Sequence, residues 1–316
     1  MPAFLILFLI FFWTNIFLMF GRIYMQYENI IRENKNRLFL YMLGMTAIIV
    51  TLGHIISQYL GYGLMGTGIS LIFAGSLNFI SYFFSDSIVI KSTGAQEIKE
   101  SDLPQYYNLV REMCKRNNLH MPRLYIINSQ ALNAFATGRN REKSIVAVTK
   151  GLLEKLTPEE ISGVVGHELS HIENGDILLM SAISILAGFV SILAQMLGTR
   201  GLSAGLSRRE NSGSVAILGI VLALAAPFTA TLIKLAISRT REYSADALGA
   251  KICGNPQYLA SALNKIKYDG NPLMQANDAT AHLYISNPFK GNALANLMST
   301  HPNIDDRIQK LQQMSI

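Results

Sequence analysis

Five long apolar runs alternate with polar stretches along the chain. The runs cover about residues 3–20, 38–60, 64–84, 177–197 and 214–237. A helix needs about 20 apolar residues to cross the hydrocarbon core of a bilayer, and each run approaches or reaches this length. The pattern therefore predicts an α-helical membrane protein, with the lipid bilayer as a partner. The second and third runs are joined by the uncharged Gly61-Tyr62-Gly63, which indicates a tight transmembrane hairpin.

Basic residues beside the first run indicate an orientation. Arg22, Arg32, Lys35 and Arg37 follow it, and the positive-inside rule predicts that their loop is cytoplasmic and the N-terminus outside. No basic residue precedes the run and no small-residue cleavage site follows it, so we do not expect a cleaved signal peptide.

The linker between the last two runs departs from this rule. Residues 198–213 hold Arg200, Arg208 and Arg209 against Glu210, yet lie outside if both runs span. Either the linker is translocated despite its charge, or the two runs form a shallow hairpin that does not fully cross.

The polar stretches predict a small α/β unit. From Asp86 onward the pattern is that of a soluble segment, and the C-terminal stretch is polar again. The predicted strands are 87–91, 123–127, 133–137 and 144–148, and the predicted helices include 102–116 and 256–267. Strand 133–137 and its partner are joined by a hairpin turn at 139–141. An exposed edge on 133–137 would suit an added peptide strand, although ordinary sheet core is an equal alternative.

A helix is predicted to begin at Thr157. Thr157 is a good N-cap, Pro158 suits the first helical position, and Glu160 completes a capping box. Apolar residues recur along one side of this helix, which anchors it to a core. Residues 173–176 then end or kink it.

Composition excludes several classes of protein. Half of the residues are hydrophobic and 15% are charged, with a net charge of +6. The basic residues flank apolar runs, so we expect no nucleic-acid partner. Cys114 and Cys253 are too few for a disulfide framework or a cysteine-rich zinc site, and we interpret them as buried apolar residues.

The helix that begins at Thr157 carries the sequence H-E-x-x-H. His167 and His171 are four residues apart, so both imidazoles lie on one helical face and can reach one Zn²⁺ ion. Glu168 is placed to act as a general base. Among the remaining histidines, we expect His54 to be neutral and hydrogen-bonded between helices, and His120 and His282 to lie on the surface.

A hydrolytic zinc site needs a third protein ligand and an open position. Glu242 is our candidate ligand, and Asp246, one turn later, is placed to hydrogen-bond a liganding histidine. The alternative is a solvated charged face. Both halves of the site must lie on the same side of the membrane, close to its surface. In the tail, His301 and Arg307 are candidate donors to a reaction oxyanion, or else surface residues.

These motifs together resemble the HtpX family of heat-shock-linked membrane zinc metalloproteases. The resemblance is carried by HELSHIENGD (167–176), TREYSADA (240–247), NAFATG (133–138) and STHP followed by Arg307 (299–307), and it runs from about residue 38 to the end. More distant resemblances are to the prenyl-protein (CaaX) metalloprotease and to the stress protease of the inner mitochondrial membrane.

The resemblance implies an α+β zincin-like protease domain whose small mixed sheet packs on the H-E-x-x-H helix. One Zn²⁺ per chain would be held by His167, His171 and Glu242, with Glu168 as the base and Asp246 bonded to a ligand. Asn133 and Ala134 would line the substrate edge, and His301 and Arg307 would stabilise the transition state. The family further implies a multi-pass protein of the plasma (inner) membrane with a cytoplasmic active site that cleaves misfolded or unfolded membrane proteins.

We accordingly divide the chain into five segments. Residues 1–37 form an extra N-terminal transmembrane segment with its basic loop, 38–85 a transmembrane hairpin, and 86–176 the first cytoplasmic half of the protease. Residues 177–237 form a hydrophobic hairpin, and 238–316 the second cytoplasmic half with the third ligand. Two alternative functions remain: a CaaX-type prenyl-protein protease, and a non-catalytic membrane metal-binding or chaperone-like protein. The same ligand set also suits Mn²⁺, Co²⁺ or Fe²⁺.

Overall fold

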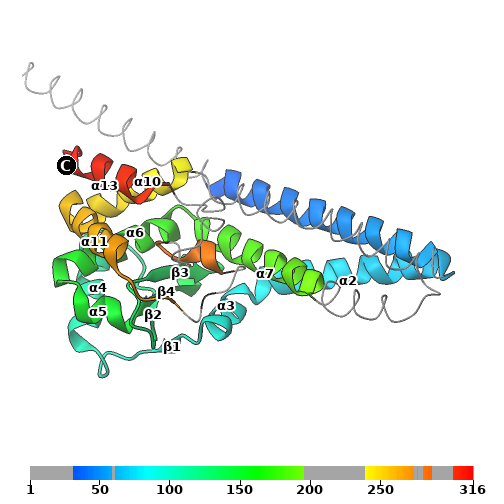
Figure 1. Ribbon diagram of the computed structural model, residues 1–316, viewed down its shortest axis with the longest axis horizontal. Coiled ribbons are helices and arrows are strands. Elements are labelled where there is room, and N and C mark those ends of the chain that lie inside the picture. The colour runs from blue at the N-terminus through cyan, green and yellow to red at the C-terminus, as the bar shows by residue number, and fades with distance from the viewer. Residues whose placement is uncertain are drawn as a thin grey trace, which may run out of the picture.

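A pair of long apolar helices projects from a mixed α/β body in the computed structural model (Figure 1). The structure describes residues 31–58, 61–195, 239–273, 276, 280–286 and 302–315. The first apolar run, Arg22, the linker 198–213, the run 214–237 and His301 lie outside the described residues. The architecture is mostly helical with one small mixed sheet, as the sequence predicts.

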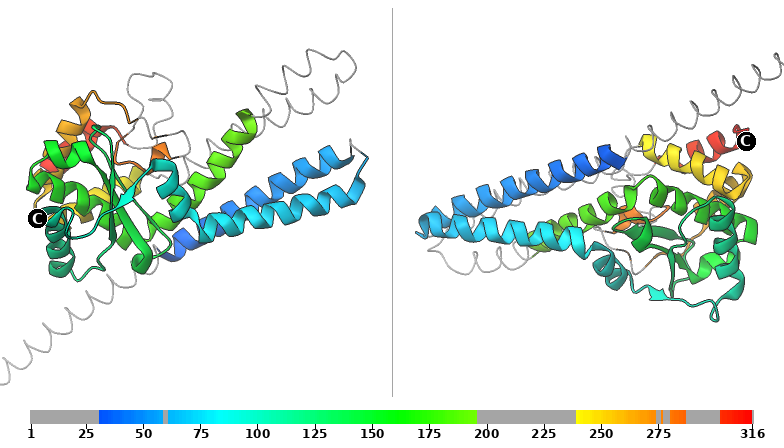
Figure 2. Two further views of the ribbon diagram at one scale, coloured as in Figure 1. Left: turned by 90° about the horizontal axis from the view of Figure 1, so that it is seen from below. Right: turned by 180° about the vertical axis from the view of Figure 1, so that it is seen from behind.

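The predicted hairpin is formed by the helix Ile31–Gln58 and by α2, Gly63–Phe83 (Figure 2). Both helices are long and apolar enough to cross a membrane, and little of either is covered by protein. Asn78 donates to the carbonyl of Met42 and to the hydroxyl of Thr46 across the pair. His54 Nδ1 lies 2.8 Å from the hydroxyl of Thr67, which confirms the prediction of a histidine bonded between helices.

The first helix begins earlier than predicted. Arg32, Lys35 and Arg37 lie on the helix, so the prediction that they belong to a loop is wrong. Glu33 and Arg37, four residues apart, form an ion pair that supports the helical turn.

Residues 87–91 are helical, so the strand predicted there is also wrong. They belong to α3, Ser85–Thr93, which follows α2 after a short break. The run Ile88-Val89-Ile90 resembles a strand, but a short apolar run has no decisive periodicity. Asp86 in the first turn and the left-handed Gly94 at the C-terminus favour the helix instead.

The sheet has four strands in the order β1-β2-β4-β3. The strands are β1 Gln96–Glu97, β2 Arg123–Ile127, β3 Ala134–Gly138 and β4 Ser144–Thr149. β2 and β4 are parallel, whereas β3 pairs antiparallel with β4 through the predicted hairpin, which contains the short helix η1, Arg141–Lys143. β3 is therefore at the edge of the sheet that the described residues form. Ala134 and Ala136 belong to one hydrophobic cluster and Phe135 to another, so both faces of the strand are covered.

Helices surround the sheet, with α6, Pro158–Glu173, at the centre. The others are α4 Pro104–Arg116, α5 Lys150–Lys155, α7 Asp176–Gln195, α10 Arg239–Cys253, α11 Pro256–Tyr268, the short η3 Ala281–Leu283 and α13 Ile304–Gln312. The capping box of α6 is confirmed, and its Glu160 also accepts from Ser261 and Lys265 on α11. The bond to α11 fixes the start of the helix that carries H-E-x-x-H.

Of the remaining predictions for single residues, some are confirmed and one is wrong. Cys114 and Cys253 are free and buried, as predicted. His120 is exposed as predicted. His282 is not on the surface: it is 2% exposed, and its Nε2 lies 3.1 Å from the hydroxyl of Ser184 on α7. Residues far away in the sequence cover it, and a sequence pattern does not reveal them.

Candidate metal centre and active site

His167 and His171 project from the middle of α6 and converge. They are 1% and 4% exposed, and their Nε2 atoms lie 3.2 Å apart. The rings meet edge to face, at a centroid distance of 4.7 Å. One helical turn thus directs two imidazole nitrogens to one point, as the four-residue spacing predicts.

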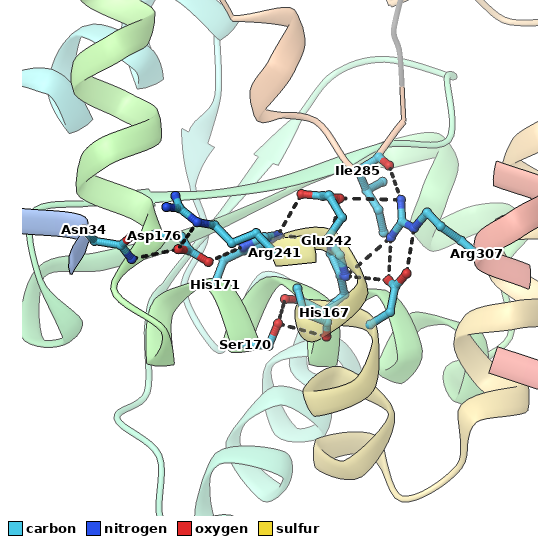
Figure 3. Close-up of polar contacts among 11 residues, drawn as sticks. Asn34, His167, Ser170, His171, Asp176, Arg241, Glu242, Ile285 and Arg307 are labelled. Carbon is cyan, nitrogen blue, oxygen red and sulfur yellow. Dashed lines mark hydrogen bonds and ion pairs between the residues drawn. The ribbon is translucent and has the colours of Figure 1, made fainter. Parts of the chain in front are cut away.

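Glu242 reaches the same point from α10 (Figure 3). Its carboxylate oxygens lie 3.9 Å from His167 Nε2 and 3.6 Å from His171 Nε2. One donor atom from each of the three residues lies within 4.8 Å of the other two, and all three side chains are buried. Two imidazoles and a carboxylate are a donor set that suits a divalent transition metal.

The electrostatics of the cluster also fit a cation. Burial lowers the pKa of His171, but the carboxylates of Asp176 and Glu242 outweigh it and raise that pKa to about 9. The two carboxylates therefore favour a positive charge on this ring, and a metal ion bound to the ring would take the place of the proton.

Helices α6 and α10 approach closely because each has a glycine at their contact, Gly166 on α6 and Gly249 on α10. A Cβ atom added to Gly249 of α10 would lie 2.7 Å from the backbone nitrogen of His167, and one added to Gly166 would lie 2.6 Å from the carbonyl oxygen of Gly249. Ser170 adds a 3.0 Å hydrogen bond to the carbonyl of Ala245. The distance between Glu242 and the histidines therefore depends on this glycine contact.

We expect Gly249→Ala to weaken metal binding as well as the fold. The added methyl group has only backbone to displace, so α10 must move away from α6, at a cost of about 1–3 kcal/mol. Zinc titration and thermal unfolding of the variant measure the two effects. Gly68→Ala is a suitable control, because the space around its Cβ position is open. Gly254→Ala is not suitable, because the φ of Gly254 is +87°. Wild-type zinc affinity in Gly249→Ala would contradict the argument.

Asp246 lies one turn after Glu242 and bonds to the far side of His167. Its Oδ1 is 2.9 Å from His167 Nδ1, as predicted. Burial raises the pKa of Asp246, but Arg307 and His167 outweigh it and hold that pKa at about 2. Burial in turn lowers the pKa of His167 to about 4 despite the carboxylate. At neutral pH this ring is uncharged and its Nε2 is able to bind a metal.

Glu168 is buried beside the three donors. It is 2% exposed, and its Oε1 has no hydrogen-bond partner within the described parts of the chain. Burial is the main cause that raises its pKa, to about 7, and the charge of Glu242 acts in the same direction. A buried carboxylate with a free oxygen and a pKa near neutrality is suited to accept a proton.

Comparison with known proteins agrees with this geometry. The model of peptidase family M48 matches residues 101–315. The chain belongs to peptidase family M48. A protease HtpX homolog from Syntrophobacter fumaroxidans (strain DSM 10017 / MPOB) is 47% identical over 274 residues, which are 85% of this chain and 95% of the relative. The resemblance to the HtpX family is thereby confirmed.

A solved structure is also similar to this M48 peptidase. The crystal structure of S. mikatae Ste24p aligns at 16% identity with a TM-score of 0.47. The alignment covers 90% of this chain and 66% of Ste24p, which is just under two thirds of its length. Family membership makes the protein a metalloprotease, a hydrolase of peptide bonds.

Residues 285 and 286 of the M48 peptidase already form hydrogen bonds to the predicted substrate edge. Ile285 donates to the carbonyl of Ala134 at 2.9 Å, and Asn133 Nδ2 donates to the carbonyl of Ser286 at 3.1 Å. Asn133 also accepts from the backbone of Ala134. The polar groups of Asn133 and Ala134 are thus already paired. Ala136, two residues along the same edge, contributes a backbone hydrogen bond to Glu168.

Arg307 lies behind the cluster of three donor residues. It is 1% exposed and donates to both oxygens of Asp246, at 2.8 and 2.7 Å, and to the carbonyl of Ile285. Its Nη1 is 3.9 Å from Glu242 Oε2. The sequence predicts a role for this residue at the site, and the structure places it against the carboxylate of Asp246, which bonds to His167.

One residue of the site is missed by the sequence reasoning. Asp176 is fully buried, and its Oδ2 lies 3.1 Å from His171 Nδ1. The sequence suggests only that this residue helps to end α6. The available signal is its place just beyond the helix, five residues after His171, where the turn directs a side chain back to the ring.

Proposed function

We propose that the chain is a membrane-integrated zinc endopeptidase with one Zn²⁺ held by His167, His171 and Glu242. The observation that carries the proposal is the buried cluster of three donor atoms with Glu168 beside it. Three protein ligands leave an open position, which distinguishes a catalytic site from a closed structural one. A bound zinc ion supplies Lewis acidity towards the scissile carbonyl and a water molecule that ionises near neutral pH.

The chain's own residues supply the proton transfers. Glu168 accepts the proton of the attacking water and donates it to the leaving amine, a task for which a pKa of about 7 is suitable. Asp246 keeps the Nδ1 proton on His167 and so leaves Nε2 for the metal. Arg307 holds Asp246 in place, and we assign the donor to the oxyanion to His301, which precedes Arg307 in the same tail.

The substrate is proposed to extend along the open part of β3. Asn133 and Ala134 border this edge, with their polar groups paired to residues 285 and 286. A peptide added as a strand would therefore meet the edge from Ala136 onward, where it would compete with Glu168 for the backbone N–H of Ala136. This position would bring a peptide bond to the general base.

We propose that the hairpin crosses the inner membrane and that the active site faces the cytoplasm. Arg32, Lys35 and Arg37 lie at the end of the hairpin next to the body, and Lys91 on α3 is close to the same end along the chain. The far turn, Gly61-Tyr62-Gly63, carries no charge. This asymmetry supports a cytoplasmic body under the positive-inside rule. A site next to the membrane suits misfolded or unfolded membrane proteins as substrates.

Metal content measured together with proteolysis tests the function. We expect about one zinc per purified wild-type chain in detergent, and chelator-sensitive cleavage of an unfolded membrane protein. Glu242→Ala should lose both. Glu159→Gln, an exposed glutamate on α6, is the control and should lose neither. Zinc in the wild type without any cleavage would favour the non-catalytic alternative, and absence of zinc would reject the proposed centre.

A further inference from the structure

Asp176 connects three separate parts of the molecule at one buried carboxylate. It is the first residue of α7 and has no exposed surface. Its Oδ2 lies 3.1 Å from His171 Nδ1 on α6. Its Oδ1 accepts from Asn34 of the first apolar helix at 2.9 Å and lies 3.5 Å from Arg241 Nε on α10 (Figure 3).

We infer that Asp176 and Asn34 are positioning residues for the metal ligand His171, so that the membrane hairpin helps to set the metal affinity. This inference rests on the proposed zinc function. A carboxylate that accepts the Nδ1 proton of a histidine fixes the ring and its tautomer and directs Nε2 to the metal. Asp176 stands in this relation to His171, as Asp246 does to His167.

The two carboxylates differ in what holds them. Asp246 is held by Arg307, from the C-terminal part of the body. Asp176 is held by Arg241 of α10 and by Asn34. Asn34 lies four residues before Leu38, the point at which the second apolar run begins. The hairpin therefore contributes a hydrogen bond to the support of one metal ligand and not of the other.

The start of the first helix is seated on the turn between α6 and α7. Asn34 Nδ2 donates also to the carbonyl of Asn174, the residue that caps α6. Ile31 lies 3.4 Å from the Cβ position of Gly175, and Leu38 packs with residues of α7. A shift of the hairpin relative to the body would move Asn34 and release Asp176 from one of its partners.

A simpler role for Asp176 makes a different prediction. An acidic residue in the first turn stabilises a helix through the helix dipole and the free backbone N–H groups. If that were its whole role, substitutions at Asp176 and Asn34 would lower the stability of the fold but would leave the zinc affinity of the folded protein unchanged. Zinc affinity is therefore the measurement that separates the two roles.

The test uses the full chain in detergent with three variants. Asp176→Asn keeps the size of the side chain but removes its charge, and Asn34→Ala removes the bond from the hairpin. Asn78→Ala is the matched control, because Asn78 of α2 also makes two bonds between helices. Its partners Met42 and Thr46 lie about two and three helical turns beyond Asn34 on the helix Ile31–Gln58. Zinc dissociation constants are measured by competition with a chromogenic chelator, alongside thermal unfolding of the zinc-free proteins.

We expect zinc affinity to fall about 10- to 100-fold in Asp176→Asn, as for other residues that bond to a liganding histidine. Asn34→Ala loses its bond to the carbonyl of Asn174 and its bond to Asp176. Loss of the bond to Asp176 should weaken zinc binding about 3- to 10-fold. Asn78→Ala should bind zinc as the wild type does. Saturating zinc should restore cleavage in Asn34→Ala, with kcat recovering and KM for the peptide unchanged.

Two results would overturn the inference. The first is wild-type zinc affinity in Asn34→Ala and Asp176→Asn, with only the unfolding temperature lowered. The second is an equal loss of affinity in Asn78→Ala, which would indicate general disruption of the hairpin. Should Asp176→Asn fail to fold, Asn34→Ala decides alone. If the wild type binds zinc and cleaves its substrate, and both variants bind zinc with wild-type affinity, only this inference is rejected. If the wild type binds no zinc, the proposed function is rejected as well.

Discussion

Glu168→Gln is expected to remove proteolysis while zinc remains bound. The three donor atoms belong to His167, His171 and Glu242, so the substitution leaves the ligand set intact. The amide has the size of the carboxylate and fits the same buried space, but it does not accept a proton. General acid–base catalysis contributes about 10²- to 10⁴-fold in rate, so cleavage should fall by at least this factor.

The measurement pairs zinc content with the initial rate of cleavage of an unfolded membrane protein. Glu159→Gln makes the same chemical change on the exposed side of α6 and should retain the wild-type rate. Thermal unfolding should show Glu168→Gln to be at least as stable as the wild type, because the wild-type carboxylate is buried and one of its oxygens has no hydrogen-bond partner among the described residues. Cleavage at the wild-type rate would show that another group accepts the proton.

Features encoded over a few neighbouring residues are predicted well from this sequence. The capping box at Thr157, the helix that follows it and the convergence of His167 and His171 all depend on contacts within about one helical turn. The strand Arg123–Ile127 is predicted residue for residue. The spacing of Glu242 and Asp246 likewise predicts that one reaches the metal cluster and the other bonds to His167.

The wrong predictions concern residues whose structure depends on contacts with parts of the chain that are distant in sequence. Ile88 to Ile90 pack within a helix between the hairpin and the sheet, although their side chains suit a strand equally well. Asn34 and Asp176 are 142 residues apart, and no local pattern signals their contact. His282 is buried by α7, about 100 residues earlier in the chain. These contacts follow from the way the helices pack, which short patterns in the sequence do not reveal.

At Arg307 the local motif indicates the residue but not its partner. Its place in a motif shared with the HtpX family marks it as functional, and the chemistry of a guanidinium suggests a donor to an oxyanion. The structure shows a different use of the side chain: both oxygens of Asp246, 61 residues earlier in the chain, accept from it. The residue type is predicted by the motif, whereas its partner is determined by the seating of α13 against α10.

Arg307→Met is expected to destabilise the protein by about 3–5 kcal/mol and to lower its zinc affinity. Methionine fills much of the space, but Asp246 would lose both hydrogen bonds from the guanidinium and remain as a buried charge near Glu242. Denaturant unfolding of the zinc-free protein measures the first effect, and chelator competition the second. Arg307→Lys should recover only part of either, because an ammonium group does not reproduce the paired geometry.

The double variant Asp246→Asn with Arg307→Met shows whether the two side chains act as a pair. With both charges of this pair removed, neither side chain remains as a buried charge without the other, so the double variant should be less destabilised than the sum of the two single variants. Its zinc affinity should stay low, because asparagine is a weaker acceptor for His167 Nδ1. Additive losses of stability would contradict the pairing. Full stability with loss of catalysis in Arg307→Met would instead return this residue to the role of a donor to the oxyanion.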